Sequence, residues 1–170
     1  MNPRFSTRLR LEPIGLDHAE DLHRLHQDPA VAAWWDGVWT EQVAEQNACR
    51  FAAGWAADGV SKWLAYDRFS GDLVGRGGLS RLHLDGADRL EVGWTILGRL
   101  WGNGYATEIG RTALTFAFEE LGADEVVAFT EPHNERSRAV MERLGMTYRR
   151  DITHDNIQFV LYSVSAIERA

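Results

Sequence analysis

The amino-acid sequence predicts a mixed α+β domain with hairpins in its middle and a βαβ unit in its second half. Short apolar or alternating runs separated by glycine turns, at residues 62–97, predict the hairpins. Beyond residue 98 helical and strand periods alternate, which predicts the βαβ unit. The 170 residues are 45% hydrophobic and 25% charged, without a linker-like segment or repeat, so we expect one domain over residues 1–170.

The first strand and the first helix are predicted near the N-terminus. Residues 7–12 alternate leucine with charged side chains, the period of two that is typical of a half-buried strand. Asp17, with Glu20 three positions later, has the pattern of a capping box, so we expect a helix from Asp17 through about Gln27.

Two further helices are expected before the hairpins. Asp28 followed by Pro29 is typical of an N-cap with proline at the first helical position, and this pair predicts a short helix that carries Trp34 and Trp35. A longer helix is expected over residues 40–57.

The hairpins and the βαβ unit come next along the chain. Strands are expected over residues 62–67, 73–84 and 89–97, with a turn at Asp85-Gly86 between the last two. The second half is expected to contain a helix at 105–121, a strand at 125–130, a helix at 135–144 that ends at Gly145, and strands at 147–150 and 158–164.

Charge and targeting signals narrow the class of protein. Eighteen Lys and Arg against 25 Asp and Glu give a net charge of −7 and a pI near 5.3. This balance argues against binding to nucleic acid or anionic membranes, which require a basic surface. The sequence has no apolar run long enough to span a membrane and no signal-peptide pattern, so we expect a cytoplasmic protein.

Cysteine and histidine give no indication of a metal site. The single cysteine, Cys49, excludes an internal disulfide and a multi-cysteine metal site, and we expect it to be a small buried apolar residue. His23 and His26 lie three positions apart on one predicted helix, but metal binding would also need carboxylates at the same place. We therefore expect no bound metal.

A glycine-rich turn between a strand and a helix is the first candidate for chemistry. Residues 99–106 read RLWGNGYA. Gly102 and Gly104 let the backbone curl so that successive N–H groups point to one place, and the helix N-terminus adds about half a positive charge. Such a turn can bind a pyrophosphate without lysine, or it can be only a tight turn. It is not a P-loop, and Thr107 replaces the third glycine of the dinucleotide fingerprint.

The second candidate is the segment 134–146, NERSRAVMERLGM. Asn134 fits a helix N-cap, and Val140 and Leu144 can bury one side of the helix. Taken alone, this segment is an ordinary capped helix. Ser137 has no histidine three or four residues away, so nothing in the segment marks it as a nucleophile.

In combination, these two segments and the strand EVVAFT at 125–130 resemble the GNAT acetyltransferase superfamily. The spacing R-x-x-G-x-G-x-A at 99–106 matches its acetyl-CoA pyrophosphate motif. WGNGYATE at 101–108, preceded by EVGW at 91–94, resembles more narrowly the Rim branch of ribosomal-protein N-terminal acetyltransferases, as do the TRLRLEP and DPAVAAWW stretches. The resemblance covers nearly the whole chain and implies the acyl-CoA N-acyltransferase fold, a mostly antiparallel sheet with a central splay, flanked by helices.

The resemblance implies direct transfer of an acetyl group from acetyl-CoA to an amine, with no covalent enzyme intermediate. Pantetheine is then expected along the exposed backbone of the splayed strand and the pyrophosphate on the glycine turn. Asn134 matches a position that helps hold the pantetheine or the helix start. The residues expected to bind acetyl-CoA are Thr95, Ile96, Leu97, Arg99, Leu100, Trp101, Gly102, Asn103, Gly104, Tyr105, Ala106, Thr107 and Asn134.

Glu91 and Ser137 are the expected catalytic residues. Glu91 matches the glutamate of the family's EVGW-type strand and is the candidate base, because an amine with a pKa of about 10 is mostly charged at neutral pH. The alternative for Glu91 is an edge carboxylate paired with Arg89 or Arg76. The family's frequent general acid is a tyrosine, but Met141 stands there, so Ser137 becomes either the proton donor or only a residue of the helix cap.

Tryptophan is concentrated in the first part of the chain. Five of the seven tryptophans lie within the first 63 residues, in the segment expected to wall the acceptor pocket. Trp34, Trp35 and Trp39 with Asp36 are candidates to hold a cationic amine, and simple core packing is the alternative. The acceptor is expected to be a small-molecule or peptide amine, which the net negative charge mildly favours as basic. A homodimer, common in the family, stays open.

Two classes of function remain open from the sequence. The first is an acetyl-CoA-dependent N-acetyltransferase. The second is a non-catalytic acyl-CoA-binding or regulatory protein of the same fold, which Met141 favours because it removes the usual tyrosine. A nucleotide-binding oxidoreductase has only the Gly-x-Gly turn in its favour.

Overall fold

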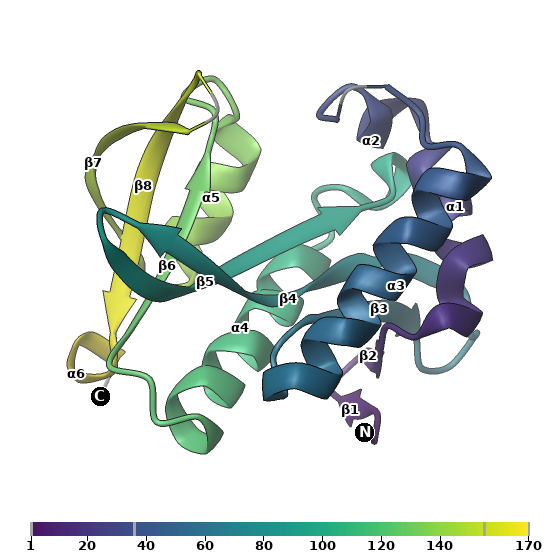
Figure 1. The fold of residues 1–170 in the computed structure, drawn as a ribbon, viewed down its shortest axis with the longest axis horizontal. Helices are drawn as coiled ribbons and strands as arrows, with labels where there is room; N and C mark the ends of the chain where they lie inside the picture. Colours follow the sequence, from purple (N-terminus) through teal and green to yellow (C-terminus); the bar gives the residue numbers. More distant parts are fainter. Residues whose placement is uncertain (1, 36, 155, 170) are drawn as a thin grey trace.

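The computed structural model describes residues 2–35, 37–154 and 156–169. In these residues eight strands form one sheet in the order β1-β2-β3-β4-β5-β6-β8-β7 (Figure 1). Neighbouring strands are antiparallel except β5 and β6, which are parallel. The strands are β1 (Arg4–Phe5), β2 (Leu9–Pro13), β3 (Lys62–Asp67), β4 (Leu73–Leu84), β5 (Ala87–Ile96), β6 (Glu125–Thr130), β7 (Thr147–His154) and β8 (Ile157–Ser165).

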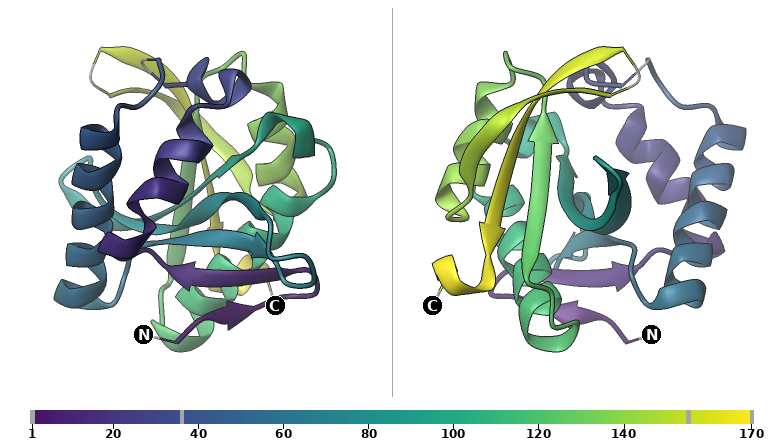
Figure 2. Two further views of the ribbon diagram at one scale, coloured as in Figure 1. Left: turned by 90° about the vertical axis from the view of Figure 1, so that its right-hand side faces the viewer. Right: turned by 60° about the vertical axis from the view of Figure 1, so that its left-hand side comes forward.

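Helices cover both faces of this sheet. Figure 2 shows the first three helices on one side and the next two on the other. The helices are α1 (Ala19–His26), α2 (Pro29–Ala32), α3 (Glu41–Asp58), α4 (Tyr105–Thr115), α5 (Glu135–Arg143) and α6 (Ala166–Arg169), with short helical segments at Leu16–His18, Gly98–Leu100 and Phe116–Glu120. In the described part of the chain, no helix combines the length and apolar character needed to cross a membrane.

The sheet divides the hydrophobic core into two large clusters. One cluster joins α4 and α5 to the strands and contains Ile109 and Val92. The other joins α1 and α3 to the opposite face and contains Leu25, Phe51 and Leu64. Burial of one such side chain stabilises a fold by about 1.5–3 kcal/mol, so both helical layers are firmly attached to the strands.

The order of elements predicted from the sequence is confirmed, but the start of the first helix is not. The capping box at Asp17 and Glu20 is wrong, because a short helical turn at Leu16–His18 precedes α1. In that turn the backbone N–H of Gly15 donates to Nδ1 of His18 (2.9 Å). The His18 ring therefore takes the role that Glu20 was expected to play, because it accepts a hydrogen bond from the N–H of the N-cap residue.

Two other details differ from the prediction. α2 ends at Ala32, so Trp34 and Trp35 lie in the turn beyond it and not in the helix. Cys49 is exposed, not buried, because the buried side of α3 is the one that carries Ala48 and Phe51. Cys49 follows Ala48 directly and so points away from that side.

Candidate functional site

The sheet opens between β5 and β6. These strands pair only at residues 90–91 of β5 and 126–127 of β6. β5 continues to Ile96 with β4 as its partner on one side. The opposite edge of β5, over residues 92–96, therefore has no strand beside it, and this open edge is the predicted splay. Backbone N–H and C=O groups on such an edge can bind an extended ligand.

The end of the open edge is closed by the turn that follows it. The N–H of Leu97 donates to the carbonyl of Val74 (3.0 Å). The indole N–H of Trp101 folds back and donates to the carbonyl of Ile96 (2.8 Å). One carbonyl at the end of the open edge is therefore already bonded within the chain.

The glycine turn curls as the sequence indicates. Gly102 and Gly104 have φ of 80° and 81°, in the left-handed region that side chains other than glycine rarely adopt. The N–H groups of Leu100, Trp101 and Asn103 bond to carbonyls within the turn. These three are thus used in shaping the turn and not in holding a ligand.

The N-terminus of α4 supplies free backbone donors directly after this turn. Gly104 is the N-cap residue, and no side chain caps the helix. The first N–H groups of a helix lack intrahelical acceptors, so those of residues 105–107 point out of the end of α4. Together with the helix dipole, they form a site suited to a phosphate group.

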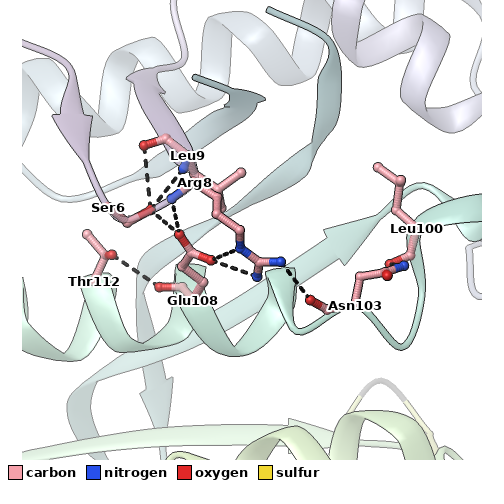
Figure 3. A network of polar contacts seen from close by, with 7 residues as sticks. All are labelled: Ser6, Arg8, Leu9, Leu100, Asn103, Glu108 and Thr112. Carbon is pink, nitrogen blue, oxygen red and sulfur yellow. Dashed lines mark hydrogen bonds and ion pairs between the residues drawn. The ribbon is translucent and has the colours of Figure 1, made fainter. Parts of the chain in front are cut away.

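A polar network braces this helix end against the β1–β2 hairpin (Figure 3). The Arg8 side chain donates to Glu108 (2.8 Å) and to the carbonyl of Asn103 (3.0 Å). Ser6 Oγ and the N–H of Arg8 donate to the other carboxylate oxygen of Glu108, each at 2.7 Å. Partial burial raises the pKa of Glu108, but the hydrogen bonds outweigh it and hold that pKa below its usual value. The brace therefore requires the ionised carboxylate.

Asp28 connects the glycine turn to α2. One of its carboxylate oxygens accepts the N–H of Ala30 (2.8 Å), as the predicted N-cap requires, and the other accepts the N–H of Gly98 (2.9 Å). A Cβ added at Gly98 would lie 2.5 Å from the Cβ of Ala30, so only glycine fits at this contact. The Asp28 carboxylate thus links α2 to the turn that follows the open edge.

The start of α5 lies close to the glycine turn. Asn134 caps α5 by accepting the N–H of Ser137 (3.1 Å), which confirms the predicted cap. The guanidinium of Arg136 lies 4.8 Å from the ring centre of Trp101. Met141 is 2% exposed and belongs to the core, so it offers no polar atom to a ligand.

Glu91 is paired with a lysine that the sequence did not indicate. Lys62 is 6% exposed, and its Nζ donates to Glu91 (2.9 Å) and to the carbonyl of Gly78 (3.0 Å). Burial lowers the pKa of Lys62, and the charge of Glu91 opposes that effect. The alternative partners expected for Glu91 are wrong, because Arg89 pairs with Glu125 and Arg76 bonds to a histidine.

On the face that carries α1–α3, Arg76 sits in a cluster of rings. Its Nε donates to Nε2 of His26 (3.3 Å), and its guanidinium lies over Trp35, Trp39 and Phe51 at 4.9–5.7 Å. His26 stacks on Trp39 with ring centres 3.4 Å apart and planes within 2°. Two of the tryptophans expected to hold a cationic acceptor therefore already contact an arginine and a histidine of the chain itself.

Trp34 lies apart from that cluster. Its ring stacks on His133, which follows β6, with centres 5.3 Å apart. The contact joins the segment after α2 to the segment before α5. Asp36, the fourth residue of the expected acceptor set, falls outside the described residues.

The acetyltransferase (GNAT) domain family matches residues 8–147. The chain belongs to this family. The GNAT chain is 29% identical over 146 residues to YkkB of Bacillus subtilis, covering 86% of this chain and 85% of YkkB. It is 30% identical over 152 residues to the FsC-acetyl coenzyme A-N(2)-transacetylase of Aspergillus fumigatus, covering 84% of this chain and 64% of that protein.

A solved structure has the same fold. RimL, a ribosomal L7/L12 alpha-N-protein acetyltransferase in complex with coenzyme A, superposes with a TM-score of 0.78 at 15% identity, over 95% of this chain and 96% of RimL. The similarity to the GNAT family predicted from the motifs is therefore confirmed, together with acetyl-CoA as co-substrate and N-acetyl transfer as the class of activity. The described part of this GNAT chain contains no cluster of three or more His, Cys, Asp or Glu able to hold a metal.

Sequence reasoning missed the charged side chains around the open edge. Lys62 and Arg76 each stand within an otherwise apolar or glycine-rich strand, KWLAYD and LVGRGGL. A charge inside a buried strand is rare unless it has a partner or a role, so both were detectable as exceptions. Asp28 was predicted as a helix N-cap, and Glu108 fell within the predicted helix at 105–121. Their contacts with Gly98 and with the β1–β2 hairpin depend on tertiary packing.

Proposed function

We propose that this GNAT chain transfers an acetyl group from acetyl-CoA directly to a primary amine of a small molecule or peptide. The observation that carries the proposal is the position of the open β5 edge. It ends at the glycine turn, and the uncapped N-terminus of α4 follows that turn. An extended thioester arm and a pyrophosphate need these two features in this order.

In this proposal, the acetyl-CoA arm lies along Thr95, Ile96 and Leu97. Its pyrophosphate accepts from free N–H groups of the turn and of residues 105–107, and Arg136 stands nearby as a cation. Asn134 holds the first turn of α5 in place rather than the cofactor, because its side-chain oxygen is used by the helix.

Glu91 is the proposed general base, acting directly or through water. The amine nitrogen, once deprotonated, attacks the thioester carbonyl carbon, and the C–S bond then breaks. Lys62 holds the Glu91 carboxylate in one orientation, which a base needs in order to receive a proton from a bound amine. Ser137, in the first turn of α5, is the proposed donor of a proton to the departing thiolate.

The acceptor class stays broader than one molecule. RimL is a ribosomal L7/L12 alpha-N-protein acetyltransferase and the Aspergillus relative is an FsC-acetyl coenzyme A-N(2)-transacetylase, so similar proteins differ in their acceptors. In this chain the segment of Trp34 contacts His133, just before α5.

A non-catalytic acyl-CoA-binding protein is the second candidate. It is favoured by Met141, whose buried thioether replaces the hydroxyl expected of a general acid. Ser137 is close in sequence and is the residue that would compensate for the change.

Turnover separates the two candidates. The protein is incubated with acetyl-CoA and a panel of primary amines, and free thiol and acetylated product are measured. We expect amine-dependent thiol release, and about a 100-fold loss in Glu91→Gln that is largest below about pH 8, where free amine is scarce. Acetyl-CoA binding by calorimetry shows whether the variant is folded. Binding of acetyl-CoA without amine-dependent thiol would establish the non-catalytic candidate.

A pH–rate profile decides the role of Glu91. Ser137→Ala is the companion variant, because it leaves the ion pair with Lys62 intact. If Glu91→Gln and the parent protein have the same profile, Glu91 is not the base and the proton leaves by another route.

A further inference from the structure

Arg76 is a buried cation that forms no ion pair with any carboxylate among the described residues. It lies on β4, where its backbone pairs with Leu64 on one side and with Thr95 of the open edge on the other. The residue is 5% exposed. In the residues that the structure describes, its one hydrogen bond is to His26, and no carboxylate lies within ion-pair distance.

The charges around Arg76 do not cancel. Burial lowers the pKa of Arg76 to about 10, with a further lowering by Arg50, while Glu91 acts in the opposite direction. Glu91, however, is bonded to Lys62. Among the described residues that act on Arg76, three cations (Arg76 itself, Lys62 and Arg50) therefore face the single carboxylate of Glu91, so these groups together are positive although the whole chain carries −7.

The aromatic rings compensate this charge only in part. The attraction between a cation and an aromatic ring is weaker than the cost of removing an ion from water. Trp35, Trp39 and Phe51 also fix the guanidinium plane, which leaves less freedom for it to turn toward solvent. An oriented, partly compensated guanidinium is suited to an anionic ligand.

The two Nη atoms form the free edge of the Arg76 guanidinium. Burial lowers the pKa of His26 to about 3, so the ring is neutral and its Nε2 accepts the Nε–H of Arg76. Among the described residues, the side-chain nitrogens that are both sealed from solvent and unpartnered are His26 Nδ1 and Arg89 Nε. The two Nη atoms of Arg76 are not sealed in this way, so each keeps contact with solvent.

We propose that the Nη edge of Arg76 binds a carboxylate of the acceptor, so that the acceptor is a small amine that also carries a carboxylate, such as an amino acid. The inference rests on the proposed function, because it concerns the same acceptor. The backbone of Arg76 pairs with Thr95, on the strand whose open edge is expected to present the thioester. A carboxylate held by a neighbouring strand suits an acceptor whose amine and carboxylate belong to one small molecule.

The inference changes the role of the tryptophans. Trp35 and Trp39 hold the chain's own arginine in place, and the arginine holds the acceptor. A purely cationic acceptor such as a polyamine would meet a positive charge here and be disfavoured.

The test compares matched acceptors. Each amino acid in a panel is paired with its own primary amide, which keeps the amine and removes the carboxylate. We expect the parent protein to have at least about tenfold higher kcat/KM for the best amino acid than for its amide, the ratio that a charge-assisted pair gives. Arg76→Gln should reduce this ratio to about one.

A second variant and a binding measurement keep the two proposals separate. Arg50→Gln is the matched control, because Arg50 is an exposed arginine that stacks on the same Phe51 ring, and it should keep the preference.

Thermal stabilisation of the CoA-loaded protein by each acceptor is measured without turnover. Equal transfer to amino acids and amides would overturn the role of Arg76 and leave the proposed function intact. A different result would support the role of Arg76 and contradict the proposed function. In that result only acceptors with a carboxylate stabilise the protein, Arg76→Gln abolishes this stabilisation, and no acetyl transfer is detected. If no acceptor is distinguished by its carboxylate in either assay, the inference fails.

Discussion

The two sides of the open β5 edge are built from different parts of the chain. Toward α4, the groups offered to a ligand are backbone N–H groups of the glycine turn and of residues 105–107. Toward α1–α3 they are side chains from three strands, chiefly the buried Lys62 and Arg76 and the partly exposed Glu91. Backbone N–H groups can bind any phosphate of the right size, whereas charged side chains select a ligand by the sign and position of its charge. The comparison therefore separates the proposed cofactor site, built from backbone groups, from the proposed acceptor site, built from side chains.

The largest effect is expected when one charge of the Lys62–Glu91 ion pair is removed. Glu91→Gln leaves Lys62 buried beside a neutral partner, and we expect a loss of about 3 kcal/mol in the free energy of unfolding. The double variant Lys62→Met/Glu91→Gln should recover most of that loss, because neither charge is then left alone. Chemical denaturation of the single and double variants measures both values. A single-variant loss below about 0.5 kcal/mol would mean that this region is not built on coupled charges.

A smaller effect, on the affinity for acetyl-CoA, is expected from a substitution in the glycine turn. Gly104→Val forces a β-branched residue into the left-handed region and disturbs the start of α4, so we expect acetyl-CoA to bind at least about tenfold more weakly. Gly122→Val is the control, since Gly122 also has a positive φ (65°), a Cβ there would meet no atom within 4 Å, and it lies beyond the other end of the helical segment that follows the turn. Calorimetric titration gives both affinities. If the two variants bind acetyl-CoA equally well, the turn is only a connection between β5 and α4.

The glycine turn and the side chains that face α1–α3 also differ in how far the sequence could predict them. The cofactor side depends on contiguous residues, and the spacing of Gly102, Gly104 and the helix that follows is legible in one short motif. Most element positions were predictable for the same reason, because each depends on local periodicity and caps. The motif could not show that Trp101 would bond the carbonyl of Ile96, which depends on how the turn folds back.

The acceptor side depends on residues far apart in the chain. His26, Arg76 and Trp39 meet only after α1, α3 and β4 have packed, so no spacing in the sequence indicates their contact. The error over Glu91 has the same origin. Arg89 and Arg76 were chosen as partners because they were near in sequence or in the expected hairpin, while Lys62 lies on β3, across β4. Pairing across two strands is set by the fold and not by local pattern.

The smallest effect concerns the brace that supports the backbone region. Glu108 has a lowered pKa, so its contribution to stability is complete above its ordinary value of 4.5 and is lost as the pH falls toward its value in the folded protein. We expect Glu108→Gln to lose about 1 kcal/mol at neutral pH, with a flatter decline of stability in acid. Unfolding measured between about pH 3 and pH 7 tests this prediction. Glu120→Gln removes another carboxylate that binds the N-terminal strand, through Arg4, and serves as the control.

The limited pairing of β5 with β6 has a consequence for the lifetime of the protein. Two residue pairs carry the continuity of the sheet from β5 to the C-terminal strands. A bound acetyl-CoA arm would complete the ladder beyond them, and a ligand that binds only the folded state at 100 times its Kd stabilises it by about 2.7 kcal/mol. Resistance to unfolding and proteolysis would then follow the supply of acetyl-CoA. The abundance of the protein would in this way report the metabolic state of its surroundings before any acceptor is modified.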